Sequence, residues 1–256
     1  MDLGLQGRVA LVTGGSSGLG LESARALWEN GVEVILVSRD ATRLTAAKAQ
    51  LELDPSSENR APIHTLAFEI SDATTIPNLI AMAHGLVHHI DIVIANAGGP
   101  PSGGLFDVTE ADLTAAVNRN FLAMASLVRH TIDPMIEARW GRIIAITSLW
   151  VRQPSPNLIL SNAARSGLTS YLKTASQAVA QFGVTINTLQ PGLHETDRLT
   201  ALYHGDLTAA ARSVPSQTLG RARDFGAVAA FLASEQARYI NGASIPIDGG
   251  LYSGLM

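Results

Sequence analysis

A glycine-rich stretch near the start of the chain has the residue types and spacing needed to hold a phosphate group. Residues 12–20 read VTGGSSGLG, and Gly14, Gly18 and Gly20 permit a tight turn and a close approach of the backbone to a ligand. The stretch follows a β-branched run and opens an apolar-periodic helix, whose first N–H groups attract an anion. We therefore expect a dinucleotide diphosphate here; a tight turn without a ligand is the alternative.

The residues after the second β-branched run distinguish between two dinucleotides. NAD(H) is held at this turn by an acidic residue that accepts from the adenosine ribose hydroxyls. Here the turn carries Ser38 and Arg39, and a guanidinium pairs with a 2′-phosphate while a small hydroxyl leaves room for it. Asp40 comes one position later and is expected to cap the next helix. The turn favours NADP(H) over NAD(H), unless Arg39 is an ordinary surface charge.

Short apolar runs that must position these residues alternate with longer amphipathic stretches. The short runs predict strands at residues 8–13, 33–37, 63–67, 92–95, 142–147, 184–189 and 244–247. The longer stretches predict helices at 19–29, 41–51, 76–88, 110–138, 158–182 and 223–234. Continuously apolar strands suit a parallel sheet that is covered on both faces. We predict a single doubly wound α/β domain over residues 1–256, a Rossmann arrangement of about seven parallel strands.

Residues 194–219 break this alternation after the sixth predicted strand. In a doubly wound domain the carboxyl ends of the strands border the ligand crevice, so this segment is predicted to be a substrate lid. A disordered surface insertion is the alternative.

The composition narrows the classes of partner. The chain has a net charge of −4 and no basic run, which argues against binding to nucleic acid or to an anionic membrane. No apolar run approaches the length of a membrane span, and the first residues do not resemble a secretion signal. The absence of cysteine excludes thiolate chemistry and fits a reducing compartment. We expect a soluble cytoplasmic protein without a metal site.

In chain order, the motifs resemble those of the short-chain dehydrogenase/reductase family over almost the whole chain. The matching segments are Thr13-Gly14-x-x-x-Gly18-x-Gly20, Glu69-Ile70, Asn96-Ala97-Gly98, Asn120, Thr147-Ser148 and Pro191-Gly192 with Thr196. The resemblance implies that Ser16, Ser17 and Leu19 contact the cofactor together with the three glycines. It places Glu69 and Ile70 beside the adenine, and Pro191, Gly192 and Thr196 around the nicotinamide, with Asn96, Ala97 and Gly98 also bordering the cofactor.

The same resemblance implies catalytic roles for three polar residues. Ser148 stands where the family has its catalytic serine, and Asn120 where the family has an asparagine that orders a proton-relay water. Thirteen residues after Ser148, however, the family's Tyr-x-x-x-Lys motif is replaced by Ser161 and Arg165. The only lysines in the chain are Lys48 and Lys173, and neither follows a tyrosine by four residues.

The replacement changes the expected chemistry. A serine hydroxyl is much less acidic than a phenol and a ring shorter, so Ser161 is a poor proton donor unless a water links it to the substrate. Arg165 lies one helical turn from Ser161 on the same face, where its fork is able to bind the ribose hydroxyls. A guanidinium stays charged near neutral pH and does not supply a proton.

Three functions are compatible with this pattern. The protein is an active reductase or dehydrogenase of a carbonyl compound or alcohol; or it binds NADP(H) as a sensor or scaffold without catalysis; or it performs another reaction with the dinucleotide as a structural ligand. In the first case the proton comes from His194 or from a water ordered by Asn120 and Ser161, or else Arg152 stabilises the oxyanion.

The two long helical stretches, 110–138 and 158–182, are apolar on more than one face and rich in small residues. Such helices pack against a copy of themselves across a two-fold axis. The family commonly associates through the equivalent helices, so a homodimer or homotetramer is expected.

Overall fold

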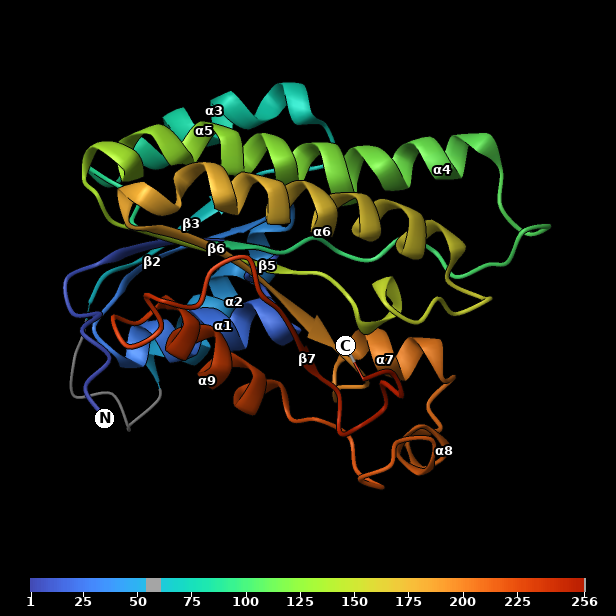
Figure 1. Ribbon diagram of the computed structural model, residues 1–256. Helices are drawn as coiled ribbons and strands as arrows, with labels where there is room; N and C mark the ends of the chain where they lie inside the picture. The colour runs from blue at the N-terminus through green and yellow to red at the C-terminus, as the bar shows by residue number, and fades with distance from the viewer. Residues whose placement is uncertain (54–60, 256) are drawn as a thin grey trace.

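Within residues 1–53 and 61–255, which the computed structural model describes, the strands form one seven-stranded parallel sheet (Figure 1). Its order is β3-β2-β1-β4-β5-β6-β7. The strands are β1 (Val9–Thr13), β2 (Glu33–Ser38), β3 (Ile63–Ala67), β4 (Ile92–Ala95), β5 (Gly141–Ile146), β6 (Val184–Pro191) and β7 (Ser244–Ile247). The order reverses between β1 and β4, so a crevice opens beyond the carboxyl ends of these strands.

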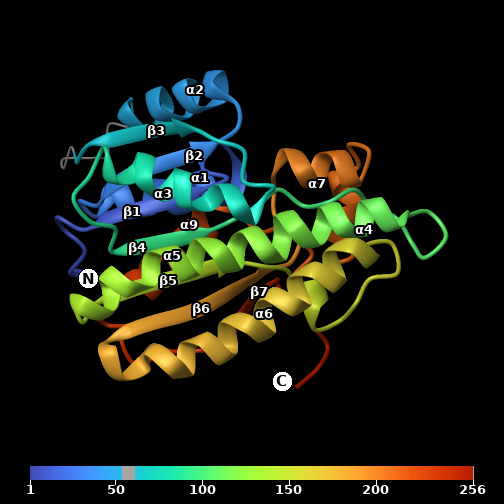
Figure 2. The same cartoon turned by 90° about the horizontal axis from the view of Figure 1, so that it is seen from above.

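Helices cover both faces of the sheet. The helices α1 (Gly18–Glu29), α2 (Ala41–Glu52) and α9 (Ala222–Ala233) pack on one face. The other face carries α3 (Ile76–His84), α4 (Glu110–Val117), α5 (Ala123–Glu137) and α6 (Ile159–Val179), and Figure 2 shows α4 and α5 running in line beside α6. The predicted doubly wound Rossmann arrangement is confirmed.

Alternation within the strands explains why the central strands β1 and β4 are almost entirely apolar. In β1, Val9 and Leu11 join the core beneath α3, α5 and α6, whereas Ala10 and Val12 join the core over α1 and α9. Successive side chains of a strand point to opposite faces, and both faces here are covered, so every position is buried. The strand interior therefore carries no chemistry, and polar residues collect where the strands end.

Two predicted helices are interrupted. The predicted helix 110–138 contains a π-helical turn at Asn118–Leu122 between α4 and α5, and the predicted helix 158–182 ends at Val179, before a 3₁₀ turn at Ala180–Phe182. A π-turn adds one residue to the helix, and because this stretch is apolar on more than one face, the resulting shift of the apolar pattern is not visible in the sequence.

The segment 194–219 contains two short helices, α7 (Asp197–Leu202) and α8 (Leu207–Arg212). Thr196 caps α7 by accepting a hydrogen bond from the Leu199 N–H, and Asp206 caps α8 in the same way. Both helices pack on a small apolar cluster of Leu193, Leu199, Ala210 and Val214. They lie beside the carboxyl ends of the strands (Figure 1), where a lid was predicted.

No helix in the described part of the chain combines the length and apolar character that crossing a membrane requires.

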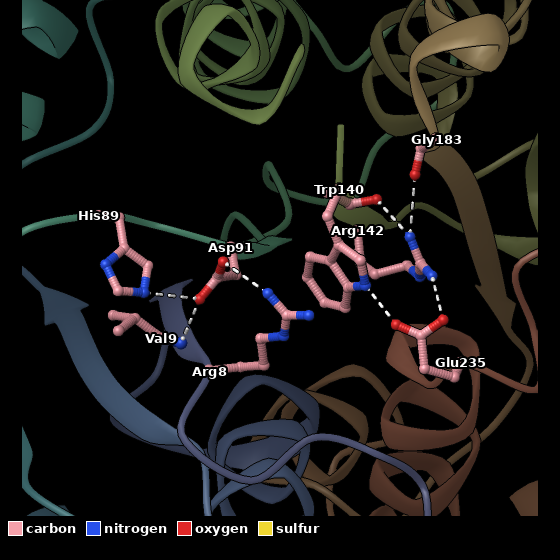
Figure 3. A network of polar contacts seen from close by, with 9 residues as sticks. Arg8, Val9, His89, Asp91, Trp140, Arg142, Gly183 and Glu235 are labelled. Carbon is pink, nitrogen blue, oxygen red and sulfur yellow. Dashed lines mark hydrogen bonds and ion pairs between the residues drawn. The ribbon is translucent and has the colours of Figure 1, made fainter. Parts of the chain in front are cut away.

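At the amino ends of the strands, an indole is held between two guanidiniums (Figure 3). Trp140 lies 3.8 Å from Arg8 and 4.4 Å from Arg142, measured from its ring centroid to each guanidinium carbon. Glu235 accepts from the Trp140 indole N–H and lies 3.8 Å from Arg142, and Asp91 accepts from Arg8 at 3.3 Å. Each buried or half-buried cation at this edge therefore has its own carboxylate.

Glu235→Ala is expected to lower the free energy of unfolding by about 1–2 kcal/mol, because the Trp140 N–H loses its acceptor and the buried Arg142 loses its carboxylate partner. Urea denaturation measures the change. Glu52→Ala removes an exposed carboxylate that lies 3.7 Å from Lys48, and serves as a control expected within about 0.5 kcal/mol of wild type. Equal effects of the two substitutions would contradict a structural role for Glu235.

Candidate active site

A cavity of about 710 Å³ opens beyond the carboxyl ends of the strands. Because parallel strands end at one edge, segments that follow β1, β2, β4, β5 and β6 all reach it. The predicted cofactor and catalytic residues line it with two exceptions, Gly20 and Asn120. Those that line it are Gly14, Ser16, Ser17, Gly18, Leu19, Ser38, Arg39, Glu69, Ile70, Asn96, Ala97, Gly98, Ser148, Ser161, Arg165, Pro191, Gly192, His194 and Thr196.

The glycine-rich loop has the geometry of an anion site. Gly14 and Gly18 adopt positive φ angles of 59° and 56°, which other residues rarely accept. A Cβ atom at Gly20 would lie 2.3 Å from the Gly14 carbonyl oxygen, so this residue closes the loop rather than lining the cavity. Ser17 caps α1 without a side-chain hydrogen bond, which leaves the N–H groups of the first turn available to a ligand. The residues present fit a dinucleotide diphosphate.

The end of β2 offers hydroxyls and a guanidinium. The Ser16 and Ser38 hydroxyls lie 3.0 Å apart, and Arg39 is exposed and lies 3.7 Å from Glu69. The Asp40 carboxylate accepts from the Arg43 N–H at 3.0 Å, so the prediction that it caps the following helix is confirmed. This carboxylate is thereby occupied away from any ribose hydroxyl at the turn.

Hydrogen bonds join the ends of β1 and β4 in the middle of the cavity wall. The Thr13 hydroxyl donates to the Asn96 carbonyl at 2.8 Å and accepts from the Asn96 N–H at 2.9 Å. Behind this wall, the Asn120 side-chain amide donates to the Gly98 carbonyl at 3.0 Å. Its Oδ1 atom is buried and has no partner, as expected of an acceptor that holds a water molecule.

Two serine hydroxyls face the cavity. Ser148 is buried at the end of β5 and its hydroxyl oxygen accepts from the Trp150 N–H at 3.2 Å, which leaves its own O–H free to donate. Ser161 is buried on α6, and its hydroxyl has no hydrogen-bond partner among residues 1–53 and 61–255. Trp150 also lines the cavity.

Arg165 spans the ends of β4 and β5. Its Nη1 atom donates to the Thr147 carbonyl and its Nη2 atom to the Ala97 carbonyl at 3.0 Å, while the buried Nε has no partner. Burial lowers the pKa of Arg165 to about 10, and the like charge of Arg198 adds to this effect. The guanidinium is therefore still charged at neutral pH, and only neutral carbonyls face it.

His194 and Arg152, both considered for catalysis, are held by other contacts. The His194 ring packs edge-on against Phe225 at a centroid distance of 5.3 Å, and its Nδ1 lies 3.5 Å from the Gly192 carbonyl. Burial lowers the pKa of His194, which favours the neutral ring at pH 7. Arg152 donates to the Ser244 carbonyl at 2.7 Å and is absent from the cavity lining.

Arg119 and Arg198 are among the cavity residues that were not predicted individually from the sequence. Arg198 extends from α7 to the opposite wall, where Nη1 donates to the Gly99 carbonyl at 3.1 Å and Nη2 to the Pro100 carbonyl at 3.0 Å. Its neighbour Asp197 also lines the cavity, and its exposed carboxylate lies 3.4 Å from Arg43. No sequence signal marks Arg198, because its partners are main-chain atoms about a hundred positions earlier.

His194 generates a pH-dependent stability. Its pKa is lower in the native protein than the ordinary value of 6.5, so protonation below that pH favours unfolding. We expect His194→Leu to reduce the loss of unfolding free energy between pH 7 and pH 5, as measured by urea denaturation at each pH. His88→Leu, a substitution of an exposed histidine, is the control. A steeper pH profile for His194→Leu would contradict this assignment.

Comparisons with known proteins agree with this geometry. Residues 8–206 match the short chain dehydrogenase family. The chain is 31% identical over 250 residues to the 3-oxoacyl-(acyl-carrier-protein) reductase of Vibrio cholerae, covering 98% of this chain and 99% of that protein.

Two solved structures are also similar. YwfH, an NADPH-dependent reductase involved in bacilysin biosynthesis, superimposes with a TM-score of 0.90 and 27% identity over 97% of this chain and 99% of its own. The L-sorbose reductase of Gluconobacter frateurii, solved with NADPH and L-sorbose, gives 0.91 and 25% over all of both chains. The chain is thus a member of the short-chain dehydrogenase family of oxidoreductases.

Proposed function

We propose that this protein is an NADP(H)-dependent oxidoreductase that reduces a carbonyl compound, or oxidises the corresponding alcohol, without a tyrosine as proton donor. The observation that carries the proposal is the common cavity, in which Ser148, Ser161 and Arg165 face the same space as the glycine-rich loop. When bound, the dinucleotide supplies or accepts the hydride. The segment 194–219 serves as the lid over this space.

The preference for NADP(H) rests on charge at the end of β2. Arg39 is exposed, and within residues 1–53 and 61–255 its ion pair is the long one to Glu69, so its guanidinium is able to turn toward a 2′-phosphate. The hydroxyls of Ser16 and Ser38 add donors of small volume. YwfH and the L-sorbose reductase, whose names specify NADPH, support the same choice.

In this proposal Ser148, Ser161 and Arg165 together take the role that a tyrosine–lysine pair has elsewhere in the family. The Ser148 and Ser161 hydroxyls donate to the substrate oxygen, and the fixed positive charge of Arg165 stabilises negative charge that develops on it. The substrate oxygen takes up its proton from solvent through a water held by Asn120 Oδ1, a buried atom that has no hydrogen-bond partner in the described part of the chain. We do not propose His194 as the donor, because burial lowers its pKa and so disfavours the protonated ring at pH 7.

A second candidate function is NADP(H) binding without catalysis, as a sensor or scaffold. It is favoured by the placement of Arg165, both of whose Nη atoms donate to main-chain carbonyls. An arginine with this structural role would persist after loss of the reaction. We also keep as predictions a cytoplasmic location and a homodimer or homotetramer formed through α4, α5 and α6, where Leu113, Leu122 and Tyr171 expose apolar surface.

Arg39→Met is expected to raise the Kd for NADPH about 10- to 100-fold, the loss of one charge-assisted phosphate contact, and to leave the Kd for NADH within about twofold. Calorimetric titration measures both constants. Lys48→Met, which removes another exposed cation of the same region, is the control. A parallel loss for both dinucleotides would contradict a 2′-phosphate contact at Arg39.

Ser148→Ala is expected to slow hydride transfer about 10²–10³-fold in single-turnover oxidation of NADPH, while the Kd for NADPH stays unchanged. The reason is the loss of one donor to the oxygen that becomes charged. Ser170→Ala, at an exposed position of α6, is the matched control and should retain the wild-type rate. An unchanged rate for Ser148→Ala would remove this serine from the proposed chemistry.

A further inference from the structure

The carboxylates that line the cavity have cationic partners, whereas three of the arginines that line it form no ion pair in the described part of the chain. Four carboxylates line it, and each is associated with a cation that is not one of the inner arginines. Three of them form ion pairs: Glu22 with Arg25, Glu69 with Arg39 and Asp197 with Arg43. The charge of the fourth, Glu195, raises the pKa of Arg221. Arg119, Arg165 and Arg198 also line the cavity, and in the described part of the chain none of these three forms an ion pair.

Two of these guanidiniums bracket one short segment of the wall. The Ala97 carbonyl accepts from Arg165 on α6, and the Gly99 and Pro100 carbonyls accept from Arg198 on the lid helix α7. The two positive charges are close enough for Arg198 to lower the pKa of Arg165. Carbonyl oxygens accept hydrogen bonds from the guanidinium N–H groups but carry no net charge. The positive charges of Arg165 and Arg198 are therefore not balanced by these contacts.

Arg198 is placed to reach a ligand. Part of the side chain is exposed, and the part that faces the cavity loses enough solvent to lower the pKa of its guanidinium. Its two Nη atoms already donate side by side to two neighbouring oxygens, the arrangement that a planar carboxylate offers. Exchanging two neutral oxygens for two charged ones strengthens each bond without moving the fork far.

We infer that the substrate is a carbonyl compound bearing a carboxylate, which is held between Arg198 on the lid and Arg165 on the cavity floor. This inference rests on the proposed function and adds the substrate class. The dinucleotide diphosphate is the other anion within the cavity, but the free N–H groups of α1 already serve it, and Arg198 is directed at residues 99 and 100. The lid segment thus closes when Arg198 binds the substrate carboxylate. Closure of the lid therefore depends on the presence of that carboxylate in the substrate.

The wall opposite Arg198 is shaped for this contact. A Cβ atom at Gly99 would lie 2.3 Å from the Arg198 guanidinium carbon, so any larger residue displaces the side chain from the wall. Gly99→Ala therefore offers a way to move Arg198 without removing its charge.

The test compares acids with their neutral esters. We would measure NADPH oxidation with 2-oxopentanoate, 4-oxopentanoate and the methyl ester of each, for wild type, Arg198→Met, Arg198→Lys, Gly99→Ala and Arg43→Met. Wild type is expected to prefer an acid over its ester by about tenfold or more in kcat/KM. Arg198→Met should abolish the preference mainly through KM, Gly99→Ala should reduce it, and Arg198→Lys should retain part of it.

Arg43→Met is the matched control, because it removes an ion pair of the same lid helix on its outer side. The control should keep the preference, and Arg198→Met should keep the Kd for NADPH within about twofold. Equal use of acids and esters by wild type would overturn the inference. So would an equal loss for acids and esters in Arg198→Met, which would make Arg198 a lid latch, or a matching loss of NADPH affinity, which would assign it to the diphosphate.

A binding measurement separates this inference from the proposed function. Absence of turnover with all four compounds would refute the reductase proposal for them, and calorimetry of both acids with the NADP⁺-saturated protein would then decide on the anion site. Binding that Arg198→Met abolishes would support the site without catalysis. Binding of neither acid would overturn it.

Discussion

The proposed chemistry of this protein depends on the charge of one guanidinium, which lies where two central strands end. Arg165 reaches from α6 to the carbonyls of Ala97 and Thr147, and so ties the carboxyl ends of β4 and β5 together. A lysine at this position would present one ammonium; the arginine instead spans two strands and still keeps a full positive charge at neutral pH. The surrounding hydroxyls, the lid and the cofactor loop are arranged about that charge.

The arginines at the amino ends of the strands and those at the carboxyl ends have different partners. At the amino ends of the strands, Arg8 and Arg142 stack on Trp140 and each has a carboxylate, Asp91 or Glu235 (Figure 3). At the carboxyl ends, Arg165 and Arg198 have only carbonyl oxygens. An arginine that is paired with a carboxylate contributes to stability, whereas an arginine without a carboxylate is suited to bind an anionic ligand. The two kinds of arginine lie at opposite ends of the strands.

The sequence predicted the fold and most of the cavity lining because both depend on local patterns. Continuously apolar runs mark strands buried on both faces, and a glycine triplet after the first run marks the loop that approaches a phosphate. The cap formed by Asp40 was likewise predicted from its position before a helix, and the structure agrees.

Other features of the structure, above all contacts between distant segments, could not be predicted from the sequence. The π-turn at Asn118–Leu122 was also not predicted, because it lies in a stretch that is apolar on more than one face and therefore hides the shift of the pattern. Arg198 binds the carbonyls of Gly99 and Pro100, and main-chain acceptors leave no trace in residue type. His194 was considered as a proton donor because it follows Pro191-Gly192 and because histidine has an ordinary pKa near neutrality, but its surroundings include Phe225, which is far away in the chain.

The central claim is that hydride transfer takes place in this cavity without a tyrosine acid. The most direct measurement is single-turnover loss of NADPH absorbance by the wild-type protein across a panel of aldehydes and ketones, after calorimetric titration with NADPH and NADH. Our account predicts that NADPH binds more tightly than NADH and is oxidised by at least one carbonyl compound. Tight binding of NADPH with no oxidation by any compound would contradict it in favour of a sensor or scaffold, and binding of neither dinucleotide would contradict both.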